Sequence, residues 1–272
     1  MSVGSSICTD QLAATAHAVL DRRLSPTSPR PIALALSGGG DSVALLHLAT
    51  TWTQARGRRL VALTVDHRLQ PQSRAWTEAC ADHAARLGAG FQALAWEGEK
   101  PLRGLPAAAR AARHRLLADA ARALSAQVLL IGHTADDVLE ARAMRAAGST
   151  TPEPREWSPS PVWPQGRGLF LLRPLLALRR PDLRAWLQGR SERWIEDPAN
   201  ADPRFARARA RAALEAGAAE IELAAEGPLT LAEICRIDAG GGVAFPRAAF
   251  REASAAGAQR LLGLACVCAG GG

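Results

Sequence analysis

The sequence predicts an α/β fold: an open, mainly parallel sheet with helices on both faces, followed by a small and mostly helical C-terminal part. Short apolar runs alternate with helical patterns over roughly 120 residues, which is typical of a parallel sheet. The runs are continuously apolar rather than alternating, as expected for strands covered on both faces. Polar signatures follow three of them, and in such sheets ligands bind at the carboxyl ends of strands.

An amphipathic helix over 9–24 and a linker rich in Pro and Ser open the chain. Four strands follow, each with a helical pattern behind it. The expected strands cover 32–36, 60–65, 91–96 and 128–131. The expected helices begin after Ser42, cover 73–87 and 106–124, and run from about Thr134 to Ala147.

The pattern changes after Gly148, where a run of prolines marks a long irregular loop. A strand over 169–172, a helix with Pro181 in its first turn and an arginine-rich helix are expected next. The weakly patterned end of the chain predicts a small helix, a strand over 242–245 and a helix over 247–264. We therefore divide the chain into an N-terminal helix and linker (1–30), a main domain (31–215) and a small C-terminal segment (216–272).

The composition describes a protein with a core and an excess of arginine. Its 272 residues are 48% hydrophobic, which excludes wholesale disorder. Lys+Arg number 33 against 26 Asp+Glu, and Lys100 is the single lysine. A GC-rich genome would explain the overall excess of arginine but not its local clusters, which make a phosphate-rich partner a candidate.

The cellular location follows from absent signals. Five scattered cysteines argue against a disulfide scaffold. The first residues show no basic stretch followed by an apolar one, so secretion is not expected. No apolar run approaches the roughly 20 residues that span a bilayer. We expect a cytoplasmic protein with no membrane partner.

A glycine-rich loop, Ser37–Ser42, separates the first predicted strand from its helix. Three glycines let the backbone approach a phosphate closely, and the helix N-terminus favours an anion. A simple glycine turn is the alternative. The loop resembles the pyrophosphate loop of the N-type ATP pyrophosphatases, which adenylate their substrates. This resemblance implies an ATP site made of Ser37, Gly38, Gly39, Gly40, Asp41, Ser42, Asp66 and His67.

An acidic cluster follows the fourth predicted strand. On a helix, His133, Asp136, Asp137 and Glu140 would span an arc of about 100°. Three acids on one face are unfavourable to bury unless something positive binds them, either Mg²⁺ carried by ATP or an amine. A solvated acidic helix face is the alternative.

Together the motifs resemble the tRNA(Ile)-lysidine synthase family, and the match continues beyond the ATP loop. The family carries VDHGLRPES, GLEAAARxARY, GHHADDxxET, RPLL and WxEDPSNxDxxFxRxRxR, in this order. The corresponding segments here are Val65–Ser73, Gly104–His114, Gly132–Ala141, Arg173–Leu176 and Trp194–Arg211. The last signature separates this family from other ATP pyrophosphatases.

The resemblance implies ATP-dependent ligation of free L-lysine to C2 of the wobble cytidine in tRNA(Ile) with a CAU anticodon. The C2 carbonyl oxygen attacks the α-phosphate of ATP, which gives an adenylated base and pyrophosphate. The lysine ε-amine then attacks C2 and expels AMP. ATP and Mg²⁺ are the implied cofactors, and the dimer common in this family is an open alternative.

Roles follow from the chemistry of each group. Asp41 and Asp136 are candidates for Mg²⁺, which usually needs one or two protein carboxylates. Asp137 and Glu140 are candidates for the lysine ammonium, and His133 for moving its proton.

Five arginines are candidates for the adenylate or the tRNA. Arg113 is assigned to the adenylate or the flipped base, and Arg173 is likewise assigned to the adenylate or the tRNA. Arg204, Arg207 and Arg211 share one helical face, suited to tRNA phosphates, although a solvated basic helix is the alternative. Trp157, Trp163 and Phe205 are candidates for stacking on the flipped base.

Several departures from the family pattern keep other functions open. Thr134 replaces a His, Ala141 replaces a Thr, Pro106 stands where an acid is frequent, and Ala147–Thr150 replaces RGSG. Longer members carry a large C-terminal tRNA-binding extension, so this chain is either a short form or truncated. The alternatives are a tRNA thiolase, an amidating or NAD-synthesising pyrophosphatase, and an ATP- or RNA-binding protein without catalysis.

Overall fold

A computed structural model describes most of the chain. The described residues are 9–101, 103–149, 151–198, 202–204, 206–216, 236–237, 243–244, 246, 248 and 251. The chain divides into two compact units, Met1–Ile221 and Glu222–Gly272. No helix in the described part is long and apolar enough to cross a membrane.

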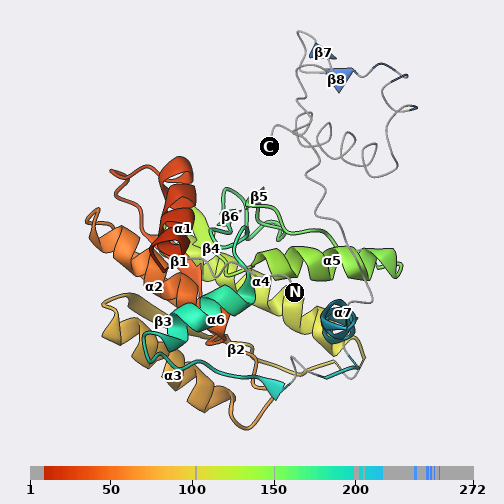
Figure 1. Ribbon diagram of the computed structural model, residues 1–272, viewed down its shortest axis with the longest axis horizontal. Helices are drawn as coiled ribbons and strands as arrows, with labels where there is room; N and C mark the ends of the chain where they lie inside the picture. Colours follow the sequence, from red (N-terminus) through yellow and green to blue (C-terminus); the bar gives the residue numbers. More distant parts are fainter. Residues whose placement is uncertain are drawn as a thin grey trace, which may run out of the picture. The chain divides into compact units, whose positions relative to one another are not determined.

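The first unit is built on a six-stranded sheet with the strand order β3-β2-β1-β4-β6-β5 (Figure 1). Five strands are parallel, and β5 is antiparallel to β6 at one edge. The strands are β1 (Ile32–Ala35), β2 (Leu60–Asp66), β3 (Gly90–Ala95), β4 (Val128–Leu130), β5 (Trp157–Pro159) and β6 (Phe170–Leu172). The predicted open and mainly parallel sheet is confirmed.

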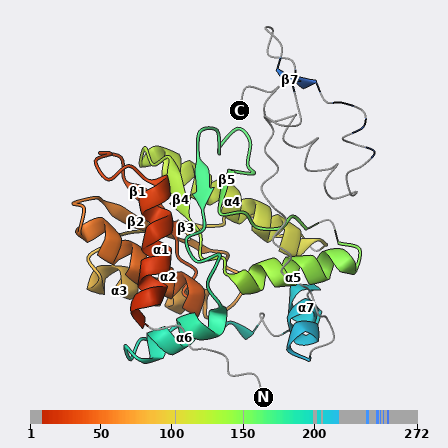
Figure 2. The ribbon, with the colours of Figure 1, turned by 45° about the horizontal axis from the view of Figure 1, so that its top comes forward.

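Helices cover both faces of this sheet. They are α1 (Thr9–Arg23), α2 (Gly40–Gln54), α3 (Ser73–Arg86), α4 (Leu105–Ala123), α5 (Ala135–Ala146), α6 (Arg180–Gln188) and α7 (Ala206–Glu215). Successive strand residues point to opposite faces, so Leu34 packs with α1, α2, α3 and α6, whereas Ala33 packs with α4. Both views show α5 and α7 side by side (Figures 1 and 2). Coverage on both faces explains the continuously apolar strands.

One strand was not predicted. β5 lies in the proline-marked segment that we expected to be an irregular loop. Its Trp157 ring stacks on Phe170 of β6 with centroids 5.0 Å apart, and this contact with β6 compensates for a weak strand sequence. Trp157 is therefore a packing residue of the sheet edge, which argues against its expected stacking on a base.

The C-terminal unit is described only in part. It contains a two-stranded antiparallel ladder of β7 (Arg236–Ile237) and β8 (Val243–Ala244). β8 falls within the strand expected over 242–245. The expected small helix, and most of the helix expected over 247–264, lie outside the described residues.

Trp52 of α2 anchors α1 to the main core and should dominate local stability. Its ring is 1% exposed, its indole N–H donates to Asp21 at 2.9 Å, and the Arg56 guanidinium lies 4.4 Å from the ring centroid. We expect Trp52→Ala to lower the free energy of unfolding by about 3–5 kcal/mol and Trp52→Phe by less. Urea unfolding measures this. Trp163→Ala, at a tryptophan that is 74% exposed, is the control with little effect.

Candidate functional site

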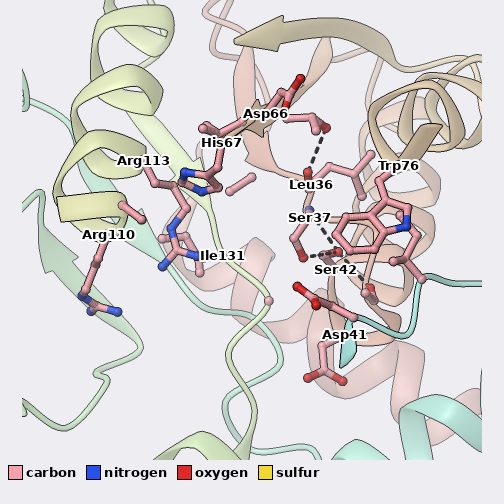
Figure 3. Close-up of a pocket in the computed structure, with 18 of the residues that line it drawn as sticks. Leu36, Ser37, Asp41, Ser42, Asp66, His67, Trp76, Arg110, Arg113 and Ile131 are labelled. Carbon is pink, nitrogen blue, oxygen red and sulfur yellow. Dashed lines mark hydrogen bonds between the residues drawn. The ribbon is translucent and has the colours of Figure 1, made fainter. Parts of the chain in front are cut away.

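A cleft of about 660 Å³ opens at the carboxyl ends of β1, β2 and β4. The glycine loop lines one side, and α4 lines the opposite side with Arg110 and Arg113 (Figure 3). Asp66 and His67, at the end of β2, lie between them. The structure thus brings together the predicted polar signatures that follow the strands, as expected for a parallel sheet.

The glycine loop is held in shape by its two serines. The Ser37 N–H and hydroxyl donate to Ser42 Oγ at 3.2 and 3.1 Å, and the Ser42 hydroxyl donates to the Gly39 carbonyl at 2.8 Å. α2 begins at Gly40 with no side-chain cap. Its N-terminus therefore faces the cleft with the polarity that stabilises a phosphate.

A distant segment packs directly on this loop. The Ile195 N–H donates to the Gly38 carbonyl at 2.9 Å. A Cβ on Gly38, whose φ is +82°, would lie 2.3 Å from Ile195 Cδ1, and one on Gly40 would lie 3.6 Å from the Trp194 ring. Gly38 is therefore required both for its backbone conformation and for the close approach of Ile195.

Arg180, at the start of α6, joins the acids of the site. Its Nε donates to Asp41 Oδ2 at 3.0 Å, one terminal nitrogen donates to Glu140 Oε1 at 2.9 Å, and the other lies 3.5 Å from Asp137 Oδ2. Burial alone would lower the pKa of Arg180, but the three carboxylates raise it above its usual value. Arg180 was not predicted as a site residue; the signal in the sequence was an Arg179–Arg180 pair at a helix N-terminus, where cations are unfavourable.

Two of the predicted tRNA-binding arginines turn inward. The Arg211 Nε donates to Glu140 Oε1 at 2.9 Å, and the Arg207 Nε lies 3.5 Å from Oε2 of the same side chain. Glu140 is 1% exposed, so these cations neutralise a buried carboxylate. Arg204, in contrast, is exposed and pairs with Asp202. Arg207 and Arg211 also line the cleft, and Phe205 lies outside the described residues.

The four polar residues expected on one helical face separate in the structure. His133 precedes α5, whose first residue is Ala135. Asp137 caps that helix by accepting the Thr134 N–H and hydroxyl at 2.8 and 3.0 Å. Asp136 does not line the cleft: Arg179 and the Arg180 backbone N–H bind its two carboxylate oxygens. The expected single face is therefore wrong for His133, whereas the three acids all contact the start of α6 and only Asp137 among them lines the cleft.

His133 is held as a neutral ring. The Arg173 Nε donates to His133 Nδ1 at 2.9 Å, which leaves the proton on Nε2. Burial lowers the pKa of His133 far below its usual value; Asp137 opposes this shift and Arg173 adds to it. Arg173 itself is fixed by the Arg155 carbonyl and the Ser158 hydroxyl. Arg173 therefore orients the His133 ring.

The opposite wall is cationic. Burial, together with Arg110 and Arg207, lowers the pKa of Arg113 to about 10, so it remains charged at pH 7. Arg113 has no hydrogen bond or ion pair with any residue in the described ranges. Burial and Arg113 lower the pKa of His67, and they lower that of His114 to about 4. A half-buried cation without a partner among the described residues, beside neutral rings, suits an anionic ligand.

The described part of the site offers one protein carboxylate to Mg²⁺ rather than two. Asp41 lines the cleft, and its buried Oδ1 has no hydrogen-bond partner. Burial raises the pKa of Asp41, and Arg180 offsets this only in part. Asp136 has both oxygens engaged, so the expected pairing of Asp41 with Asp136 around a metal is wrong. Within the described residues, no group of three or more His, Cys, Asp or Glu side chains is arranged to hold a metal.

The contact between Gly38 and Ile195 predicts how a substitution at Gly38 changes ATP affinity. Gly38→Ala adds a strained backbone and a steric clash, so we expect ATP binding to weaken about tenfold or more, measured by calorimetry. Combining it with Ile195→Ala should recover part of the loss. Gly57→Ala, which also has a positive φ but no atom within 4 Å of its added Cβ, should leave ATP affinity unchanged.

The neutral state of His133 makes stability depend on pH. The unfolded chain takes up a proton at His133 near pH 6.5, whereas the buried ring does not, so acid favours unfolding. One such group contributes up to about 1.4 kcal/mol per pH unit. We expect the free energy of unfolding to fall from pH 7 to pH 5 and His133→Asn to reduce that slope. Equal slopes in urea unfolding would contradict this account of His133.

Comparison with known proteins agrees with this geometry. A family model described as a PP-loop domain matches residues 12–216. A tRNA(Ile)-lysidine synthase of Caulobacter vibrioides is 56% identical over 197 residues, covering 72% of this chain and 48% of the relative. That of Hyphomonas neptunium is 45% identical, with 66% and 50% covered. This chain therefore spans about half the length of the curated relatives that it matches.

Solved structures support the fold alone. A U34-tRNA thiolase NcsA from Methanococcus maripaludis superposes with a TM-score of 0.58 at 14% identity, covering 77% of this chain and 73% of that one. An NMN synthetase from Francisella tularensis superposes with a TM-score of 0.53 at 12% identity, covering 80% and 89%. The family model shows that this chain belongs to the PP-loop family, and curated tRNA(Ile)-lysidine synthases are among its relatives.

Proposed function

We propose that this chain ligates free L-lysine to C2 of the wobble cytidine in tRNA(Ile) with a CAU anticodon, using ATP. The contact between Gly38 and Ile195 carries this proposal. It joins the phosphate loop to the Trp194–Arg211 signature that distinguishes lysidine synthases from other PP-loop enzymes. Nucleotide binding and tRNA modification thus depend on one packed unit.

In the first half-reaction, the loop Ser37–Ser42 holds the pyrophosphate that leaves ATP. Asp41 Oδ1 is the group that would hold Mg²⁺, and the ion would neutralise phosphate charge there. Arg113 and Arg110 line the opposite wall and stabilise the negative charge of the adenylated base.

In the second half-reaction, Asp137, which lines the cleft, is the carboxylate placed to accept a hydrogen bond from the lysine ammonium. Glu140 lies behind it, where it binds Arg180 and Arg211 and holds α5, α6 and α7 together. His133 presents its Nε2–H as a hydrogen-bond donor while Arg173 occupies Nδ1. We therefore assign His133 to orienting the substrate in its neutral form rather than to carrying the proton.

Two alternatives lose support in the described part of the chain. Cys80 is buried, and burial raises the pKa of its thiol to about 11, so it is not suited to deliver sulfur as a tRNA thiolase requires. Thr134 and Ala141, which depart from the family pattern, have local structural roles: Thr134 is bonded to Asp137, and Ala141 is fully buried. These substitutions do not indicate lost catalysis.

The proposal also includes the small ligands, the cellular location, the tRNA contacts and the oligomeric state. Free L-lysine and Mg²⁺ are proposed from the chemistry of the site, and a cytoplasmic location from the tRNA substrate. The exposed Arg204 is proposed as a tRNA phosphate contact, with Arg207 and Arg211 acting at the edge of the cleft. A homodimer remains a proposal from the family.

Lysine-dependent AMP release tests the reaction. We expect AMP release to require both free lysine and tRNA with a CAU anticodon, and mass analysis of the digested tRNA to show lysidine. Asp41→Ala should reduce ATP–pyrophosphate exchange by about 100-fold or more, because it removes the free carboxylate oxygen of the cleft. Asp119→Ala, at an exposed position on α4, is the matched control. AMP release without lysine would refute the ligase activity.

A further inference from the structure

Outside the cleft, three polar side chains from two helices gather around one carboxylate. Glu192 follows α6, and both its oxygens are bound by Arg86 of α3, at 3.1 and 2.9 Å. His47 Nε2 of α2 lies 3.4 Å from Oε1, and His83 Nδ1 of α3 lies 3.7 Å from Oε2. We call Glu192, Arg86, His83 and His47 the Glu192 clamp. None of the four lines the cleft.

The clamp joins a largely buried carboxylate to an arginine whose side chain is 53% exposed. The Glu192 side chain is 12% exposed and His83 is 10% exposed. A hydrogen bond from Arg86 is the main cause that lowers the pKa of Glu192, so this carboxylate is ionised. Bidentate pairing of arginine with a carboxylate fixes both distance and direction. Such an arrangement fixes the position of the Glu192 side chain relative to α3.

The position of the clamp in the chain indicates what it holds. The Glu192 N–H donates to the Leu187 carbonyl, which ties the residue to the end of α6. His83, which accepts a hydrogen bond from Arg86, is also bonded to the backbone of Arg193. Ile195 is three positions after Glu192, and three extended residues span at most about 11 Å. The clamp therefore limits how far Ile195 can move from Gly38.

We propose that Glu192 and Arg86 are positioning residues for the nucleotide site: they hold the segment 193–195 on the glycine loop and so maintain its phosphate-binding shape. The effect passes from Glu192 through Ile195 to Gly38, and neither residue of the pair touches the ligand. This proposal rests on the proposed use of ATP by the loop. Its structural part, the placement of Ile195, is independent of any ligand.

Two measurements on the full chain test the clamp. The first is hydrogen–deuterium exchange at the Ile195 amide, which donates to Gly38. The second is calorimetric binding of ATP together with the KM and kcat of ATP–pyrophosphate exchange. We expect Glu192→Gln to speed exchange at Ile195 and to weaken ATP binding about fivefold, raising KM more than it lowers kcat. Arg86→Lys, which keeps the charge but loses the bidentate geometry, should have a smaller effect.

Glu78→Gln is the matched control, because Glu78 pairs with Arg74 on the same helix α3 but on an exposed surface. It should change neither measurement. Thermal melts of all variants check that they fold, and Arg86→Lys is used for the test if Glu192→Gln does not fold. The proposal is overturned if hydrogen–deuterium exchange at the Ile195 amide is as slow in both variants as in the wild type. It is also overturned if this hydrogen–deuterium exchange is faster while ATP affinity is unchanged. Failure of the wild type to bind ATP would instead refute the proposed function, with the clamp still judged by exchange at Ile195.

Discussion

The arrangement of the site depends on one buried cation, Arg180. Asp41, Asp137 and Glu140 come from two helices, and their carboxylates could not be buried together without a positive charge between them. Arg180 from α6 supplies that charge, and α7 adds two further arginines around Glu140. Four helices are thus joined at the cleft by charge balance rather than by apolar packing alone. Removing one partner would leave the others buried and unpaired.

The same cleft has two walls of opposite character. On one side are the glycine loop and acids whose charges arginines already balance, and on the other are Arg110 and Arg113, beside which the described residues place no acid. In the proposed function, a nucleotide between these walls would place its phosphates against backbone N–H groups and these cations. The neutral His67, His114 and His133 rings keep the site from carrying still more positive charge.

Much of the fold could be predicted from the sequence, because the five parallel strands are short, continuously apolar runs bounded by turn residues. β5 could not, since its three residues include a proline and it forms only by pairing with β6. The glycine loop and its serines were also predictable, because their roles are local. The Mg²⁺ role expected of Asp136 was not predictable for a physical reason: a helical wheel gives the direction of a side chain within one helix, but not that the start of α6 would bind both of its oxygens.

By itself, the sequence determined the parallel sheet, the phosphate loop after its first strand and the acidic and arginine-rich segments that approach it. Only the tertiary structure decided which of these charges meet. Arg180 and Asp41 are 139 residues apart in sequence, and Arg211 and Glu140 are 71 apart. No periodicity within one helix encodes such pairs. They form because burial makes an unpaired charge unfavourable, so the packed helices leave each buried carboxylate beside an arginine.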